Sequence, residues 1–159
     1  MEMSRTHSYN IQVKWTGNKG EGTTAYRSYE RSHTLSSAGK PDIAGSSDAH
    51  FLGDAQRWNP EDLLVGSISA CHQLWYLHLC ADAGIAVLAY ADEAQGTMQE
   101  DPDRGGFFTQ ITLKPRVRIR RGDNAQLAAD LHERAHHFCF IANSVNFPVI
   151  CEPTIESEP

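Results

Sequence analysis

Residues 58–80 read WNPEDLLVGSISACHQLWYLHLC. Asn59 is a favoured N-cap residue, and Pro60 suits the first helical position, where no backbone N–H is needed. Glu61 and Asp62 place negative charge at the positive end of the helix dipole. The stretch therefore predicts a long helix that begins beside Asn59 and carries a cysteine in its middle.

One face of this predicted helix is largely apolar. The residues three or four positions apart on the face of Cys71 are Leu64, Ser67, Ile68, Leu74, Trp75 and His78. We expect this stripe to face a core or a subunit interface, with Cys71 on its buried side. Cys80 is about 180° round the helix from Cys71, so we interpret it as structural packing.

Cys71 and Cys139 occur in unlike settings, one inside an apolar helix and one just past an amphipathic segment. Cysteine is a strong nucleophile, and two cysteines on separate elements that meet in the fold suggest attack on an oxidant followed by disulfide closure. The alternative is that both are small buried hydrophobic residues. The residues by themselves leave both interpretations open.

The first third of the chain is expected to be a hairpin and a loop. Residues 7–16 alternate apolar and polar side chains, which predicts a strand with Tyr9, Ile11, Val13 and Trp15 on its half-buried face. A second strand is expected over residues 22–35. Residues 36–57 are predicted to form a long loop with a short strand near Ile43.

The remainder continues with strands, a helix and a strand. Residues 85–98 and 107–120 predict a second hairpin, and residues 147–155 a final strand. Asp123 or Asn124 is expected to cap a helix between them. The buried stripe of that helix is expected to hold Leu127, Leu131, Ala135 and Phe138. The pattern predicts an α+β fold, with residues 1–159 as one domain.

Composition excludes several classes of protein. The net charge of −6 gives no basic footprint for nucleic acid, and Arg116, Arg118 and Arg120 are expected to form only a solvated strand face. No run approaches the roughly 20 apolar residues of a membrane span, and the polar start lacks the apolar core of a signal peptide. We therefore expect a cytoplasmic protein without a membrane partner. In that compartment its 4 cysteines favour thiol chemistry or metal binding.

Three features of the sequence point to a known family. They are the motif Asn-Pro-Glu-Asp-Leu-Leu at residues 59–64, the apolar helix with Cys71, and Cys139 after a helix rich in His and Ala. Together they resemble the family of osmotically inducible protein C (OsmC) and the organic hydroperoxide resistance (Ohr) proteins. The resemblance extends from Val13 through Ser144 to the final strand. It implies antiparallel sheets packed on a long central helix, in an intertwined homodimer.

The resemblance also implies roles for individual residues. It makes Cys71 the peroxidatic thiol and Cys139 the resolving thiol. Glu61 corresponds to a carboxylate that holds an arginine against the reactive thiolate, and Arg27 is our preferred arginine, with Arg31 as the alternative. From its position alone, Glu61 is equally well explained as a helix-start carboxylate.

The sequence departs from the family where Cys139 is followed by Phe140, because many relatives have Pro there. Spacing adds a second constraint. Glu61 and Cys71 are ten residues apart, about 15 Å along one helix and about 80° apart in phase. An arginine held by Glu61 would have to bridge that gap, which favours a site in which Arg27 and Glu61 of one subunit meet Cys71 of its partner.

Four aromatic residues are candidates to contact the organic substituent of a hydroperoxide, and each is equally well explained as an ordinary core residue. They are Phe51, Trp58, Trp75 and Phe138.

Histidine supplies the main rival interpretation. His132 and His136 are spaced i, i+4 on one helical face, with Cys139 close beyond, as a zinc or copper site would require. His72 points about 100° away from Cys71 and is expected to be a polar or interface residue rather than a general base. A cysteine hydrolase is disfavoured because no Gly-rich nucleophile elbow precedes Cys71.

The expected activity is a thiol peroxidase that reduces organic hydroperoxides, with hydrogen peroxide as a further candidate substrate, without a metal or bound cofactor. Cys71 would form a sulfenic acid that condenses with Cys139 to a disulfide. An external dithiol must then reduce this bond, and the resemblance implies a lipoylated protein as one donor. The alternative is a metal-binding or storage protein, or a catalytically weak stress-response protein of the same fold.

Overall fold

The computed structural model describes residues 5–159. The chain divides into two compact units, the first ending at Leu63 and the second comprising Leu64–Pro159. We describe each unit by itself. Within the described residues, no helix has the length and apolar character to cross a bilayer. The single domain expected from the sequence stays a prediction.

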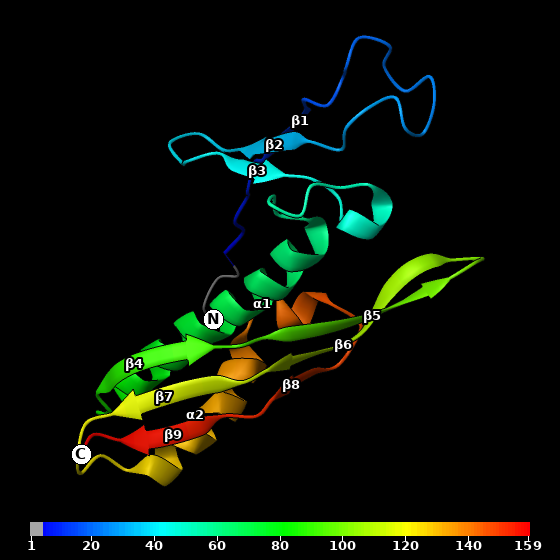
Figure 1. The fold of residues 1–159 in the computed structure, drawn as a ribbon. Helices are drawn as coiled ribbons and strands as arrows, with labels where there is room; N and C mark the ends of the chain where they lie inside the picture. Colours follow the sequence, from blue (N-terminus) through cyan, green and yellow to red (C-terminus); the bar gives the residue numbers. More distant parts are fainter. Residues whose placement is uncertain (1–4) are drawn as a thin grey trace. The chain divides into compact units, whose positions relative to one another are not determined.

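The first unit contains a small antiparallel sheet of β1 (Gln12–Trp15), β2 (His33–Ser36) and β3 (Ile43–Gly45), in that order (Figure 1). Trp15 pairs with His33, which in turn pairs with Gly45. A Cβ atom on Gly45 would collide with the His33 imidazole, so a larger residue there would require that ring to move. The pairing of the first two strands and the short strand at Ile43 confirm the predictions.

The long second strand was predicted wrongly, because residues 22–32 form a loop stabilised by side chains. Ser28 Oγ donates to the Gly22 carbonyl over 3.0 Å and accepts from the Ala25 N–H over 3.0 Å. Arg31 donates to the carbonyls of Tyr29 (2.7 Å) and Tyr26 (2.6 Å), and its guanidinium stacks on both rings. These side-chain bonds offer the backbone an alternative to a strand ladder.

The apolar face predicted for residues 7–16 is not half-buried within this chain. Tyr9 is 82% exposed, Val13 62% and Trp15 43%. The strand itself begins only at Gln12. The alternation of apolar side chains correctly indicated a strand, but it did not indicate what would cover the apolar face.

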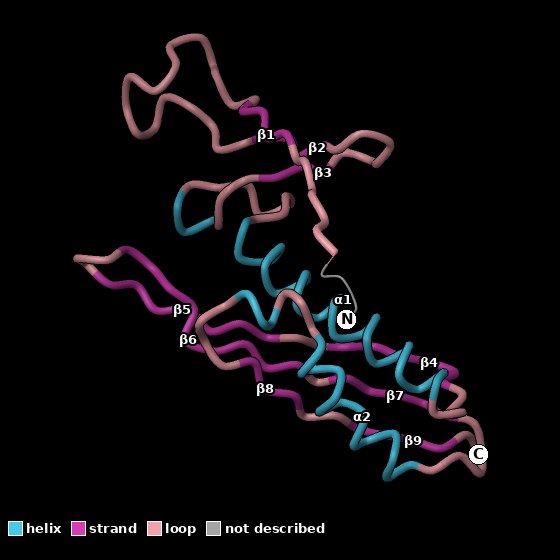
Figure 2. The backbone as a smooth tube through the Cα atoms, turned by 180° about the vertical axis from the view of Figure 1, so that it is seen from behind, coloured by secondary structure: helices cyan, strands magenta, loops and turns pink. Residues whose placement is uncertain are grey.

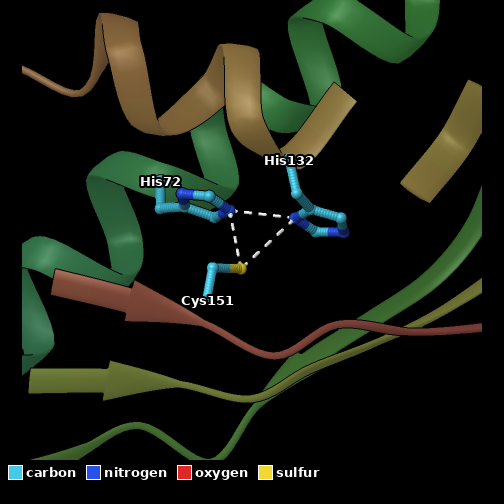
Figure 3. A group of neighbouring side chains, drawn as sticks. All are labelled: His72, His132 and Cys151. Atoms are coloured by element: carbon cyan, nitrogen blue, oxygen red, sulfur yellow. Dashed lines mark hydrogen bonds between the residues drawn. The ribbon is translucent and has the colours of Figure 1, made fainter. Parts of the chain in front are cut away.

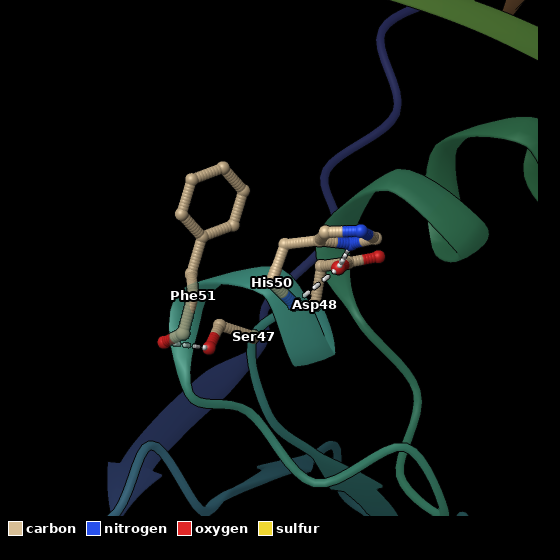
Figure 4. A network of polar contacts seen from close by, with 4 residues as sticks. All are labelled: Ser47, Asp48, His50 and Phe51. Carbon is tan, nitrogen blue, oxygen red and sulfur yellow. Dashed lines mark hydrogen bonds and ion pairs between the residues drawn. The ribbon is translucent and has the colours of Figure 1, made fainter.

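A turn centred on η1 (Ala49–Phe51) orders the long loop (Figure 4). The Asp48 carboxylate accepts from the His50 backbone N–H over 2.8 Å and contacts His50 Nδ1 over 2.7 Å. The backbone hydrogen bond is the main reason that the pKa of Asp48 is lowered. Ser47 Oγ donates to the Phe51 carbonyl over 3.2 Å. The loop then rejoins the sheet, because the Ser46 N–H donates to the Trp58 carbonyl over 2.9 Å.

Helix α1 (Pro60–Asp82) begins where the sequence predicted, since Asn59 Oδ1 accepts from the Asp62 N–H over 2.7 Å. Its buried residues are Ile68, His72, Tyr76, Leu79 and Cys80. Within one chain the expected stripe is not buried over its whole length, because Leu74 is 67% exposed and Cys71 is only partly buried, and its burial at a subunit interface stays a prediction. Hydropathy misplaced the face because two of the five buried side chains, His72 and Tyr76, carry polar atoms. Burial of Cys80 agrees with its expected packing role.

The second unit contains two three-stranded sheets. One has the order β4 (Val87–Asp92), β7 (Pro115–Ile119), β9 (Thr154–Ser157), and the other β5 (Gln95–Asp101), β6 (Gly105–Leu113), β8 (Val149–Cys151). The β4–β7 and β5–β6 pairs are antiparallel, but β9 runs parallel to β7 and β8 parallel to β6. The sheets are therefore mixed rather than purely antiparallel.

Each long strand predicted in this unit is two shorter strands that belong to different sheets. The chain leaves the first sheet at Asp92, whose carboxylate accepts from the Lys114 N–H over 2.7 Å and from Ser69 Oγ over 2.5 Å. Glu152 and Pro153 separate β8 from β9 in the same way. The alternation of apolar and polar residues that predicts a strand does not indicate where the chain passes from one sheet to the other, because it can continue across that point. The arginines of β7, Arg116 and Arg118, are exposed as expected.

Helix α2 (Ala125–Phe138) is capped by Asn124, which accepts from the Leu127 N–H over 3.0 Å. Asp123, the other candidate cap, instead accepts from the Ala86 N–H over 2.7 Å. The buried residues of α2 are Ala128, Leu131, His132 and Ala135. Leu127 and Phe138, which the predicted buried stripe included, are not among them. Both helices lie on the same face of the sheets (Figures 1 and 2).

Candidate active site

The second unit brings the two predicted redox cysteines together. Cys71 lies in the middle of α1 and is partly exposed, whereas Cys139 is fully buried at the C-cap of α2. Burial raises the pKa of the Cys139 thiol to about 11, and the neighbouring Cys71 thiol raises it further through a hydrogen bond and its charge. Both thiols are free. Neighbouring thiols from two elements are the arrangement that disulfide closure requires.

A short hydrogen-bonded turn fixes the position of Cys139. The Ala142 N–H donates to Cys139 Sγ over 3.5 Å, and the Asn143 N–H donates to the Cys139 carbonyl over 3.0 Å. Ser144 Oγ donates to the Phe140 carbonyl over 2.7 Å. The 3-10 helix η2 (Ala142–Ser144) therefore directs a backbone N–H at the sulfur, which favours its thiolate form and partly opposes the effect of burial.

Aromatic side chains border the thiol pair. Trp75, one turn after Cys71 on α1, stacks on Phe138 at 5.2 Å between ring centroids and meets Phe140 edge-on at 5.6 Å. Phe138 and Phe140 flank Cys139 in the sequence. A hollow of about 200 Å³ adjoins this group and is lined by Leu74, Trp75 and His78. The segments that carry the two cysteines therefore also carry a group of aromatic side chains in mutual contact.

This aromatic group confirms part of the sequence expectation. Trp75 and Phe138 do contact one another, and Phe140, which the sequence singled out only because it replaces proline, completes the group. Trp58 and Phe51 belong to the first unit, where both are exposed. They are therefore not part of the group beside the thiols as the second unit presents it.

The expected arginine and glutamate lie in the first unit. Arg31 is engaged with Tyr26 and Tyr29, so its guanidinium already has partners within its own loop. Within residues 5–159, the Arg27 guanidinium makes no hydrogen bond or ion pair, nor is there an ion pair between Arg27 and Glu61. Within the first unit, Arg31 therefore has hydrogen-bond partners for its guanidinium, whereas Arg27 has none among the described residues.

A second cluster lies inside the same unit, formed by His72 on α1, His132 on α2 and Cys151 on β8 (Figure 3). His72 Nε2 lies 2.9 Å from His132 Nδ1. Cys151 Sγ lies 3.7 Å from the former atom and 3.8 Å from the latter. His72 and His132 are only 1% and 3% exposed.

The cluster corrects two expectations about histidine. His136, the predicted partner of His132, is exposed, and His132 pairs with His72 instead. His72 was expected to be a polar or interface residue, and it lies in the interior, where it contacts His132 and Cys151. The sequence also gave no reason to select Cys151, because it follows Val149 and Ile150 in a short strand and has no fixed spacing to either histidine.

Burial keeps all three members of the cluster uncharged near neutral pH. It lowers the pKa of His72 to about 4 and of His132 to about 3, and it raises the pKa of the Cys151 thiol to about 12. The charge of Asp92 partly opposes the effect on His72. His72 Nδ1 and His132 Nε2 are buried and have no hydrogen-bond partner among the described residues.

Comparison with known proteins agrees with the fold. The family model described as OsmC-like protein matches residues 53–153. An OsmC-like protein of unknown function from Vibrio cholerae is 28% identical, with a TM-score of 0.85 over 94% of this chain and 100% of that one. No curated protein sequence matched.

Two further solved structures are organic hydroperoxide resistance proteins. The one from Elizabethkingia anophelis is 19% identical, with a TM-score of 0.68 over 97% of this chain and 100% of that chain. The one from Legionella pneumophila is 17% identical, with a TM-score of 0.68 over 95% of this chain and 99% of that chain. At these identities the likeness is one of fold.

Proposed function

This chain belongs to the OsmC-like protein family, and from that premise we propose that it is a thiol peroxidase acting on organic hydroperoxides, with hydrogen peroxide as a further substrate. The observation that carries the proposal is the meeting of Cys71 and Cys139, from separate helices, beside an aromatic surface. The partly exposed thiol is the one that a peroxide can reach, and the buried thiol is held next to it.

In the first step the Cys71 thiolate attacks the outer oxygen of the hydroperoxide. The O–O bond breaks, a proton goes to the departing alkoxide, and the products are Cys71 sulfenic acid and an alcohol. The surface formed by Trp75, Phe138 and Phe140 would hold the organic substituent through apolar contact. This supports a preference for organic hydroperoxides over hydrogen peroxide, which has no such substituent.

In the second step the Cys139 sulfur attacks the sulfenic sulfur, the S–O bond breaks, water leaves and the disulfide forms. In the reduced protein the Cys71 thiol contributes to the raised pKa of Cys139. A sulfenic acid is uncharged near neutral pH, so the charge part of that effect disappears once Cys71 is oxidised. The N–H of Ala142 still favours the thiolate. Cys139 is thereby activated after Cys71 has reacted.

The proposal assigns Arg27 to stabilisation of the Cys71 thiolate and Glu61 to orientation of that arginine, because a fixed cation favours the charged form of a thiol. Arg27 is supported over Arg31 because Arg31 is already held by Tyr26 and Tyr29. We further propose an intertwined homodimer in which Arg27 and Glu61 of one subunit meet Cys71 of the partner. The exposed apolar side chains of residues 9–15 support an association of subunits.

Regeneration requires an external dithiol, whose two thiols become a disulfide as the Cys71–Cys139 bond is reduced. A lipoylated protein is the proposed donor, because its dithiol is carried on an apolar chain that suits the aromatic surface. The proposed setting is the cytoplasm, where thiol–disulfide cycling is supported. No membrane or nucleic-acid partner is part of the proposal.

One experiment tests the reaction type. The reduced protein is treated with one equivalent of an alkyl hydroperoxide, and its mass is measured with and without a reagent that traps sulfenic acid. We expect a loss of two hydrogens, about 2 Da, that maps to a Cys71–Cys139 bond. The Cys139→Ser variant should instead gain one oxygen and react with the trap at Cys71. An unchanged mass, or a disulfide that includes Cys80, would contradict the proposal.

A further inference from the structure

Thiol peroxidase chemistry leaves the cluster in the interior of the second unit without a role. Its three side chains come from α1, α2 and β8, and their nitrogen and sulfur atoms converge on one point (Figure 3). We propose that His72, His132 and Cys151 bind a single d10 metal ion, copper(I) or zinc(II), through His72 Nε2, His132 Nδ1 and Cys151 Sγ. This inference does not depend on the proposed peroxidase function.

The distances fit an ion with little rearrangement. For three ligands in a plane around the ion, metal–nitrogen bonds of about 2.0 Å and metal–sulfur bonds of about 2.3 Å place two nitrogens about 3.5 Å apart and a nitrogen and a sulfur about 3.7 Å apart. The two N···S distances are 3.7 and 3.8 Å, which already agree. Only the N···N distance, 2.9 Å, must increase, by about 0.6 Å for such an ion.

The donor set matches this class of ion. Two imidazoles and a thiolate are the ligands of zinc and copper rather than of magnesium or calcium, which prefer oxygen. The neutral imidazole and the thiolate are the forms that coordinate such an ion, so the thiol would give up its proton on binding. The histidines of the predicted i, i+4 pair do not form this site, because His136 is exposed.

Without an ion, the cluster satisfies its polar atoms poorly. The two rings make one hydrogen bond to each other, while His72 Nδ1 and His132 Nε2 have no partner among the residues described. The sulfur is 3.7 Å or more from both nitrogens, so it contributes only a weak interaction. The proposed ligand atoms are the three that already face one another, and an ion between them would replace one hydrogen bond and two weak sulfur contacts with three coordination bonds.

The number of ligands favours copper(I). Copper(I) is stable with three soft or borderline ligands, and one thiolate then makes the site neutral, which suits burial. Zinc normally requires a fourth ligand, here a water molecule. Because the histidines are only 1% and 3% exposed, access for that water is restricted. Copper(I) is therefore the expected occupant, and zinc is distinguished by experiment.

The test uses the full chain carrying Cys71→Ser and Cys139→Ser, so that the redox pair cannot bind metal and only Cys80 and Cys151 remain as thiols. Copper(I) under anaerobic conditions and zinc(II) are titrated separately against a chromogenic competing chelator. We expect one equivalent of copper(I) per chain, bound more tightly than zinc. X-ray absorption should give two nitrogen neighbours at about 2.0 Å and one sulfur at about 2.3 Å.

Matched variants locate the site. In the same background, Cys151→Ala and His132→Gln should each lower the affinity by about 100-fold or more. Cys80→Ala, at the other buried thiol, and His136→Gln, at the exposed histidine of α2, should leave it unchanged. Circular dichroism verifies that each variant is folded. In the background protein itself, the ion should raise the melting temperature, and Cys151→Ala should remove that rise.

The outcomes are separable. Tighter binding of zinc with a fourth oxygen neighbour would support the site and overturn the preference for copper. Retention of affinity in Cys151→Ala, its loss in Cys80→Ala, or failure of both ions to compete with the chelator would overturn the proposal. None of these results depends on peroxide turnover, so the failure of one proposal is distinguishable from the failure of the other.

Discussion

Cys71 and His72 are adjacent in the sequence and belong to different environments. Cys71 lies on a partly exposed side of α1, beside Cys139 and an aromatic surface. His72 points into the interior, where it meets His132 and Cys151. A rotation of about 100° between consecutive helical residues is enough to separate the two settings. One helix therefore contributes to two chemically distinct clusters, a pair of neighbouring thiols and a buried imidazole–thiol group.

The two environments also differ in how accessible their cysteines must be. A peroxide needs a thiol that it can reach and that can ionise, whereas metal coordination favours donors held in a closed, uncharged environment.

The largest effect is expected at the peroxidatic thiol. Cys71→Ser should lower peroxide consumption by about 1000-fold or more, because the attacking sulfur is lost. Cys139→Ser should permit a single turnover and then stop with Cys71 as sulfenic acid. Cys80→Ala serves as the control and should remain within about twofold of the parent protein. Normal turnover by Cys71→Ser would show that the reaction uses another thiol.

The next effect concerns the arginine. Arg27→Ala should slow peroxide attack by about 10- to 100-fold, since loss of a nearby cation removes stabilisation of the thiolate. Arg31→Ala should slow it less, because Arg31 is held by Tyr26 and Tyr29. Stopped-flow measurement of Cys71 oxidation distinguishes the two. A larger effect of Arg31→Ala would reverse the assignment.

A mixing experiment then tests whether the site is shared between subunits. Inactive Arg27→Ala and Cys71→Ser proteins, exchanged in equal amounts, should recover about one quarter of the parent activity per chain. Random pairing makes half of the dimers mixed, and each mixed dimer holds one intact site of two. A monomer by sedimentation, or no recovery after demonstrated exchange, would rule out a shared site while leaving the thiol chemistry unaffected.

Alkylation should rank the thiols of the reduced protein. Near pH 7.5 we expect a maleimide to label Cys71 about 10-fold or more ahead of Cys139, because Cys139 is buried and its pKa is raised to about 11. Labelling of Cys139 should increase as the pH rises toward that value, since the thiolate is the reactive form. Peptide mapping over a pH series measures both rates, and equal labelling at pH 7.5 would contradict the difference in accessibility.

The smallest effect is expected on stability. Tyr76 is fully buried and its hydroxyl donates to the Ala128 carbonyl over 3.0 Å. Tyr76→Phe should therefore lower the free energy of unfolding by about 1 kcal/mol or somewhat more, because a buried carbonyl loses its partner. Ser67→Ala, on the exposed side of the same helix, should change it by less than about 0.5 kcal/mol. Urea denaturation measures both, and equal effects would contradict the assignment of the buried face.

The sequence by itself determined those features that depend on neighbouring residues. The caps at Asn59 and Asn124, the two main helices and the pairing of the first two strands follow from local hydrogen bonding and short-range periodicity. The family motif was also recognisable, and the two cysteines singled out from the sequence, Cys71 and Cys139, are neighbours in the structure.

Tertiary structure decided everything that depends on which surfaces meet. It selected the face of α1 that is buried, because the polar atoms of Tyr76 and the His72–His132 pair find partners only across the fold. It divided each long predicted strand between two sheets at points such as Asp92 and Pro153. It also joined Cys151 to two histidines that are distant in sequence. Periodicity carries no information about such long-range contacts, because it records only how often apolar residues recur along one element.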